Sequence, residues 1–225
     1  MSLLATPPMP ESPADEPLHG HPNANWPIYR TFIALDMEGS TLRTNPAKRV
    51  LRDRMYLLLE EGLRRSGVGA HHLDRLTDRG DGVLALIRPA DAVPKTLLLD
   101  SFIPTLVDLL TDYNHGVADQ PPLCLRLRVV IHAGDIHDDG KGFFGEELDV
   151  AFRLLDSPHV KRALALSAGS LALAISDEIF RAIVRHGYGT INAGAYRHGF
   201  CVRVSDRQRQ GWILNDPGSP SVLAR

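Results

Sequence analysis

Two aspartates, Asp36 and Asp81, lie where a short apolar run meets a glycine-containing turn. Asp36 follows the run TFIAL, and Asp81 lies in the turn DRGDG, which leads into the apolar run VLALI. Two carboxylates a few ångströms apart repel each other unless a proton or a cation lies between them. Mg²⁺ and Mn²⁺ accept such oxygen ligands and keep positions open for phosphate oxygens. The pair is a candidate metal site if the fold joins the two turns; otherwise both are ordinary turn residues.

The segment that follows Asp36 could contact phosphate. Gly39, Ser40 and Thr41 stand at a predicted helix start, where backbone N–H groups are free of intrahelical partners. Such N–H groups, together with two hydroxyls, form a suitable binding site for phosphate oxygens. The sequence contains no Gly-rich P-loop, no G-x-S-x-G elbow and no zinc-ligand spacing, which argues against those enzyme classes.

The elements that would position these residues follow from hydrophobic periodicity. Their order predicts an α+β fold with a ferredoxin-like split βαβ core and extra C-terminal strands and a helix. In such a core the strands that carry Asp36 and Asp81 can be neighbours. We expect strands at 31–35, 73–77, 83–87, 123–132, 171–175, 200–204 and 211–214, a Gly/Asp loop at 133–146, and helices at 47–65, 96–114, 147–156 and 177–186.

Composition limits the partners and the cellular compartment that we expect for this chain. The net charge of −2 provides no field that would attract nucleic acid or an anionic membrane, so neither is an expected partner. No apolar run approaches the roughly 20 residues of a membrane span, and no secretory signal is evident, which favours a cytoplasmic protein. Cys124 and Cys201 lie in strand-like runs and are expected to be buried, reduced thiols. Residues 1–26 are rich in proline and predict a disordered arm.

Four segments resemble motifs of the class III adenylate and guanylate cyclases, in the order and spacing of that family. DMEGST resembles D-(I/M)-E-G-(S/F)-T, and RGDGVLAL resembles the hairpin of the second metal aspartate. LRVVIHAGDI looks like the R-V-G-I-H strand, and FGEELDVAFRLLDSP is similar to W-G-x-x-V-N-x-A-A-R-L. The resemblance covers roughly residues 31–157 and implies that 27–225 form a catalytic domain. It also implies a lyase that converts a nucleoside triphosphate to a 3′,5′-cyclic nucleotide and pyrophosphate.

The resemblance implies a role for each matching residue. Asp36 and Asp81, with the backbone carbonyl of Met37, match the ligands of two Mg²⁺ or Mn²⁺ ions per site. Gly39–Thr41 match the phosphate-binding turn. Arg153 matches the arginine that stabilises charge on the α-phosphate during attack by the ribose 3′-oxygen, although an isolated helix arginine is usually solvated. Because the family's sites lie between two subunits, a homodimer with shared active sites is implied.

The chain departs from the family where the purine base and the ribose are read. Adenylate cyclases carry lysine and guanylate cyclases carry glutamate at the position of Thr77, and a second base-reading position is Gly142. Asp149 replaces the ribose-orienting asparagine, and Asp135 replaces a common arginine. These departures resemble the uridylate and cytidylate cyclases of bacterial antiphage signalling, whose cyclic UMP or CMP activates a partner effector. Two alternatives stay open: an adenylate or guanylate cyclase, and a degenerate module that binds nucleotide without turnover.

Some assignments remain open at this stage. Tyr56 could narrow the base pocket and Arg79 could donate to a pyrimidine oxygen, but Tyr56 could equally be a core residue. Arg203 could hold the terminal phosphates, or belong to a solvated basic face. A further cluster does not indicate a separate metal site, because its histidine matches a framework position and its aspartates fall in the expected loop: His132, Asp135, His137, Asp138 and Asp139.

Overall fold

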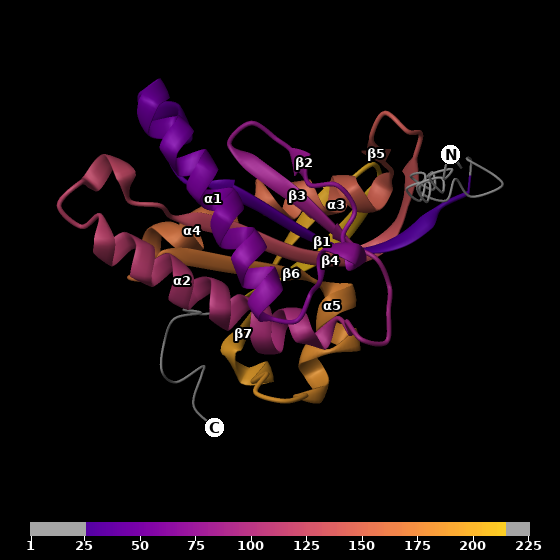
Figure 1. The fold of residues 1–225 in the computed structure, drawn as a ribbon. Coiled ribbons are helices and arrows are strands. Elements are labelled where there is room, and N and C mark those ends of the chain that lie inside the picture. Colours follow the sequence, from indigo (N-terminus) through magenta and orange to yellow (C-terminus); the bar gives the residue numbers. More distant parts are fainter. Residues whose placement is uncertain (1–25, 215–225) are drawn as a thin grey trace, which may run out of the picture.

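The computed structural model describes residues 26–214, so most of the expected arm, residues 1–25, and the last eleven residues lie outside the described part. Eight strands form one sheet (Figure 1). They are β1 (Ile28–Met37), β2 (Thr77–Asp78), β3 (Gly82–Ile87), β4 (Leu127–Asp138), β5 (Phe143–Phe144), β6 (Leu171–Ser176), β7 (Tyr196–Val204) and β8 (Arg207–Leu214). Their order is β2-β3-β1-β4-β6-β8-β7, and β5 pairs with β4 at one end.

The first half of the chain forms the split βαβ core that the sequence predicts. Strand β1 lies between β3 and β4 and is antiparallel to both, and β2 lies outside β3. Strand β6 then adds to β4 in the parallel direction, and the β7–β8 hairpin completes the far edge. The α-helices are α1 (Asn45–Arg65), α2 (Ile103–Gly116), α3 (Glu146–Leu155), α4 (Pro158–Leu166) and α5 (Asp177–Ala182).

Alternation along β1 separates two hydrophobic cores. Ile33 and Leu35 face the larger core, which α1, α2 and α5 cover. Phe32 and Ala34 face the smaller core, which α3 and α4 cover. Figure 1 shows α1 and α2 lying across one side of the sheet. Because side chains of a strand alternate between faces, Asp36 belongs to the same face as Phe32 and Ala34, the face of α3.

Several expected boundaries were wrong. Strand β4 continues to Asp138, through the first part of the expected loop, because it pairs with β1 as far as Ile136 and then with β5. Helix α4 was not expected, although Pro158 occupies its first turn and the Ser157 side chain accepts hydrogen bonds from two of its N–H groups. The expected helix at 96–114 begins with a π-helical turn, Leu98–Phe102, before α2.

Neither cysteine is a buried thiol. Cys201 is exposed and Cys124 is partly exposed, and both are free. The apolar runs around them suggested full burial, but Cys201 lies on the edge strand β7, where one face of the strand meets solvent.

Within residues 26–214, none of the helices is both long and apolar enough to cross a membrane.

Candidate active site

The fold brings the Asp36 and Asp81 turns together through backbone pairing. Asp36, near the end of β1, stands opposite Gly82, the first residue of β3. The backbone N–H of Met37 donates to the Asp81 carbonyl at 3.0 Å. A Cβ on Gly82 would lie 2.4 Å from the Leu35 carbonyl oxygen, so this close approach requires glycine. The expected neighbourhood of the two aspartate-bearing strands is confirmed.

The Asp36 carboxylate is paired with an arginine that sequence reasoning missed. Arg128, opposite Asp36 on β4, donates from Nε to Oδ1 at 2.5 Å and from Nη2 to Oδ2 at 2.7 Å. Both side chains are largely buried. Burial raises the pKa of Asp36 to about 6; the Arg128 hydrogen bonds oppose that rise, and the charges of Asp81 and Asp156 add to it. Burial is thus the largest influence on the pKa of this carboxyl group, and the bidentate guanidinium offsets it only in part.

The Asp81 carboxylate is bound by the phosphate-turn candidate. The Ser40 hydroxyl donates to Asp81 Oδ2, and Ser40 is buried in a short 3₁₀ turn, Ser40–Leu42. Gly39, at the start of this turn, has a left-handed φ of 68°, and Thr41 is exposed. The turn is separate from α1, which begins only at Asn45. The expected helix start is therefore a 3₁₀ turn that contacts the second aspartate directly.

This arrangement fits a divalent cation. The donor atoms are carboxylate oxygens, which suit Mg²⁺ or Mn²⁺. A cation beside the largely buried Asp36 would favour its ionised form, as Arg128 already does in part. Met37 is buried beside the pair, and the role expected for its carbonyl oxygen stays a prediction.

Helix α3 carries the remaining catalytic candidates along the same face of the sheet. Asp149 and Arg153 are one helical turn apart and exposed. The helix ends at Leu155, and the charge of the next residue, Asp156, reaches Asp36. Among the described residues, Arg153 has no hydrogen bond or ion pair within 26–214. The structure thus brings the end of α3 near Asp36 but leaves the Arg153 guanidinium facing outward.

The base-reading candidates do not converge in one chain. Tyr56 packs against the larger core, and burial followed by the Asp78 charge raises its pKa. The Arg79 guanidinium stacks 4.0 Å from the ring centre of Phe152 on α3, on the other face of the sheet. Thr77 is half-buried in β2, and Gly142 lies in the loop before β5, where its N–H donates to Asp139. Their roles as base contacts stay predictions.

Arg203 lies far from the aspartates of its own chain. It is exposed on β7, which is four strands away from β1 in the sheet. At roughly 4.8 Å per strand, the separation across the sheet is on the order of 20 Å. A phosphate contact from Arg203 would therefore have to reach the site of a partner subunit.

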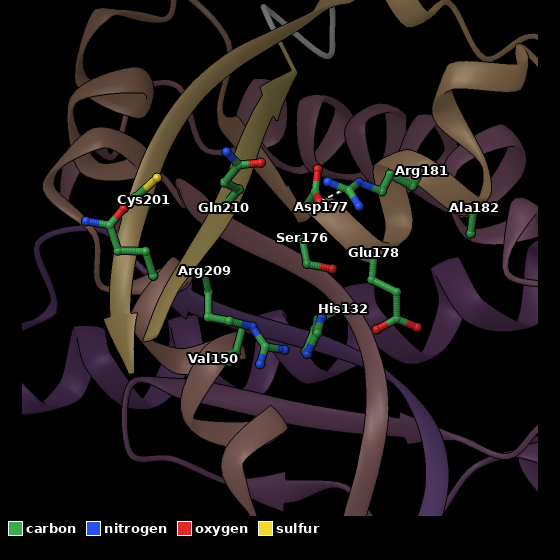
Figure 2. A pocket seen from close by; sticks show the side chains of 11 residues that line it. His132, Val150, Ser176, Asp177, Glu178, Arg181, Ala182, Cys201, Arg209 and Gln210 are labelled. Carbon is green, nitrogen blue, oxygen red and sulfur yellow. Dashed lines mark ion pairs between the residues drawn. The ribbon is translucent and has the colours of Figure 1, made fainter. Parts of the chain in front are cut away.

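A second polar group lies toward the other end of α3 and borders a cavity of about 810 Å³. Ligand atoms of His132, Glu147 and Glu178 lie within 4.8 Å of one another, a grouping that could hold a metal ion. This set differs from the cluster set aside above, of which it keeps only His132. Figure 2 shows the Arg209 side chain reaching toward the His132 ring in this cavity. Arg209 donates to Glu147 and Glu146, so the chain itself supplies a cation here.

Comparison of the sequence with protein-family models and with curated proteins gave no match. Comparison of the fold with solved structures did. An adenylate/guanylate cyclase/hydrolase from Silicibacter pomeroyi matches with a TM-score of 0.54 and 19% identity, covering 84% of this chain and 97% of that one. The adenylyl cyclase CyaB from P. aeruginosa matches at 0.57 and 13%, covering 85% and 95%. The guanylyl cyclase Cya2 matches at 0.57 and 15%, covering 88% and 96%. The chain therefore has the α+β fold of the class III nucleotide cyclases.

Proposed function

We propose that this chain is a metal-dependent nucleotide cyclase. The observation that carries the proposal is the junction of β1 and β3, where backbone pairing holds Asp36 beside Asp81 in a fold shared with adenylyl and guanylyl cyclases. The reaction would convert a nucleoside triphosphate to a 3′,5′-cyclic nucleotide. The ribose 3′-oxygen loses its proton and attacks the α-phosphorus, and the bond from this phosphorus to the β-phosphate oxygen breaks to release pyrophosphate.

The residues at the junction divide the work of this reaction. Asp36, Asp81 and the Met37 carbonyl would hold two Mg²⁺ or Mn²⁺ ions, which when bound favour the ionised 3′-oxygen and neutralise the pyrophosphate. A metal on Asp36 would share or displace the Arg128 contact, and Ser40 contacts only Oδ2 of Asp81. Arg128, once free, remains beside the triphosphate as a fixed positive charge. The N–H groups of the turn at 39–41 would bind phosphate oxygens.

The catalytic arginine would come from a second copy of the chain. Arg153 is exposed and makes no polar contact among residues 26–214, so nothing within the described chain directs it to Asp36. In a homodimer, the exposed face of α3, with Asp149 and Arg153, would complete the partner's site, and each dimer would hold two sites. A guanidinium supplied in this way would stabilise the charge that develops on the α-phosphate.

The substrate proposed is UTP or CTP. Thr77 and Gly142 offer none of the charged groups that the resemblance associates with purine reading. A site that lacks matched donors and acceptors for a purine gains little by binding one. We extend the proposal to a cytoplasmic antiphage role, in which the cyclic pyrimidine nucleotide acts on an effector protein.

The test is incubation of the purified chain with each of the four ribonucleoside triphosphates and Mn²⁺, followed by mass spectrometry of the products. We expect one cyclic nucleotide per pyrophosphate, formed mainly from UTP or CTP. Preferential conversion of ATP or GTP would contradict the pyrimidine assignment and keep the cyclase. The absence of a cyclic product from all four would contradict the cyclase proposal itself.

One observation favours a second candidate, a nucleotide-sensing module without turnover. Both metal carboxylates already have partners within the chain, Arg128 and Ser40, and Asp149 adds negative charge on the exposed face of α3. Such a module would bind triphosphate and metal and return the triphosphate intact. The variant Asp36→Ala distinguishes the two, because it should abolish turnover in a cyclase and only weaken binding in a sensor.

A further inference from the structure

The start of α3 is fixed to the sheet by a carboxylate with two cationic or polar partners. Glu147, the second residue of α3, accepts a hydrogen bond from His132 Nε2 at 2.7 Å and another from Arg209 on β8. His132 is fully buried in β4. Burial alone would raise the pKa of Glu147, but the two hydrogen bonds outweigh it and lower the pKa to about 2. Glu147 is therefore ionised at neutral pH and pairs with the Arg209 guanidinium, and its carboxylate accepts the hydrogen bond from His132 Nε2.

The strand also provides space for this side chain. Gly134 follows His132 by two residues and so belongs to the same face of β4. A Cβ on Gly134 would lie 2.5 Å from Cγ and 2.9 Å from Cβ of Glu147. The glycine thus admits the aliphatic part of Glu147, and the histidine binds its carboxylate. The segment His132-Ala133-Gly134 therefore forms the binding site for the Glu147 side chain, which we call its receptor.

The far end of α3 is held by the metal hairpin. The Arg79 guanidinium, two residues before Asp81, stacks on Phe152 at 4.0 Å. Arg153 directly follows Phe152, so it lies one residue beyond this contact, toward the C-terminal end of α3. Buried apolar side chains of α3 also hold the helix, so a loss of the Glu147 contact would permit only a small rotation about its axis. At a radius of about 5–6 Å, a rotation of 10–20° moves a side chain by about 1–2 Å, and a displacement of about 1 Å can cost on the order of a hundredfold in rate.

We infer that Glu147 is a positioning residue, which through His132 and Arg209 fixes the rotation of α3 and so the place of Arg153 in the site. The inference rests on the proposed cyclase function. It assigns a role to Glu147, which stands at an unspecified position of the fourth motif, and to the buried His132 of the third.

The test uses the full chain and the variant Glu147→Gln, with Glu146→Gln as the matched control. Glu146 is adjacent on α3 and contacts Arg209 at 3.2 Å, but not His132. We expect Glu147→Gln to lower kcat about 10- to 100-fold with KM changed less than about threefold, because the substrate still binds and only the arginine is displaced. Glu146→Gln should change kcat less than about twofold. Equal effects of the two variants would overturn the inference.

A double-mutant cycle separates positioning from a general loss of stability. If Glu147 acts through Arg153, adding Glu147→Gln to the Arg153→Lys variant should lower kcat by less than about threefold. Additive losses would overturn the inference. Should Glu147→Gln fail to fold, Arg209→Gln replaces it in the same cycle, since it leaves the contact between Glu147 and His132 in place. A wild-type chain that forms no product from any nucleotide contradicts the proposed function instead, which keeps the two failures distinct.

Discussion

Two carboxylates on the same face of the sheet, Asp36 and Glu147, both accept hydrogen bonds from arginine, yet their pKa values move in opposite directions. The pKa of Asp36 is raised to about 6, because burial and the charges of two neighbouring acids outweigh the effect of Arg128. The pKa of Glu147 is lowered to about 2, because the hydrogen bonds and charges of His132 and Arg209 outweigh the effect of burial. The pKa of Asp36 is thus governed by burial, whereas the carboxylate of Glu147 is satisfied by its two partners. This difference separates a carboxylate that awaits a ligand from one that holds the structure.

The Asp36 and Glu147 sites are linked through strand β4 and helix α3. Arg128, Val130, His132 and Gly134 follow one another on a single face of β4, so one strand carries both the partner of Asp36 and the receptor of Glu147. Helix α3 lies along this strand from Glu147 toward Asp36. The satisfied end thus positions the helix whose exposed face we assign to catalysis.

The largest loss of activity should come from removing the Asp36 carboxylate, whose pKa is raised. We expect Asp36→Asn to lower cyclic nucleotide formation by at least about a thousandfold, since a neutral amide neither balances the metal charge nor holds its geometry. Circular dichroism should show the fold intact, and the product is counted by mass spectrometry. Substantial turnover in this variant would place the metal site elsewhere, for which the group of His132, Glu147 and Glu178 would be the next candidate.

Removal of the exposed arginine should have the next largest effect. Arg153→Ala is expected to lower kcat by about 100- to 1000-fold with little change in KM, because the guanidinium acts on charge that develops only in the transition state. Steady-state kinetics measures both constants. The exposed residue Asp156, which directly follows α3, offers a control in Asp156→Asn, which should leave the chemical step within about tenfold of the wild type. A change confined to KM in Arg153→Ala would indicate ground-state binding instead.

The receptor for Glu147 makes a prediction on stability. Gly134→Ala should lower the free energy of unfolding by about 1–3 kcal/mol, because the new methyl group overlaps the Glu147 side chain. Gly142→Ala is the matched control, since nothing lies within 4 Å of a Cβ there, and should cost less than about 1 kcal/mol. Urea unfolding measures both. Similar losses in the two variants would show that α3 adapts to the methyl group.

The lowered pKa of Glu147 predicts a smaller, pH-dependent contribution to the free energy of unfolding. Because the folded pKa is about 2 and the ordinary value is 4.5, the stabilisation is present above about pH 4.5 and is lost as the pH falls toward 2. After a discount for partial exposure, the stability gap between the wild type and Glu147→Gln should narrow by about 1–2 kcal/mol between pH 6 and pH 3. Urea unfolding across this range tests it, and a gap independent of pH would contradict the assigned charge state.

Local sequence signals predicted most of the first half of the fold, although the strand expected at 73–77 forms only at Thr77–Asp78. The apolar run before Asp36, the amphipathic pattern of α1 and the glycine turn at Asp81 each predicted the element that forms. Helix α4 was missed although Ser157 and Pro158 form a regular helix start, because its 9 residues are too few to show a clear helical period. The extent of β4 could not be read from Gly134 and Asp135, since these weak strand residues are held by pairing with β1.

The candidate site was only partly visible in the sequence. The pairing of Asp36 with Asp81 followed from motif order, but the contact of Arg128 with Asp36 depends on strand register, which a single sequence does not fix. The contact of Glu147 with His132 joins residues on two elements whose packing is set by the tertiary fold. Arg128 and His132 do lie four positions apart in one predicted strand, so a shared face was the available signal.

The central claim is that the aspartate pair and Arg153 are two halves of one cyclase site, joined across subunits. Mixing two inactive variants, Asp36→Asn and Arg153→Ala, tests it most directly. After subunit exchange, half of the dimers should hold one complete site, so the account predicts recovery of about a quarter of the wild-type rate of cyclic nucleotide formation. No recovery, with mixed dimers shown to be present by differential tagging, would contradict a shared site.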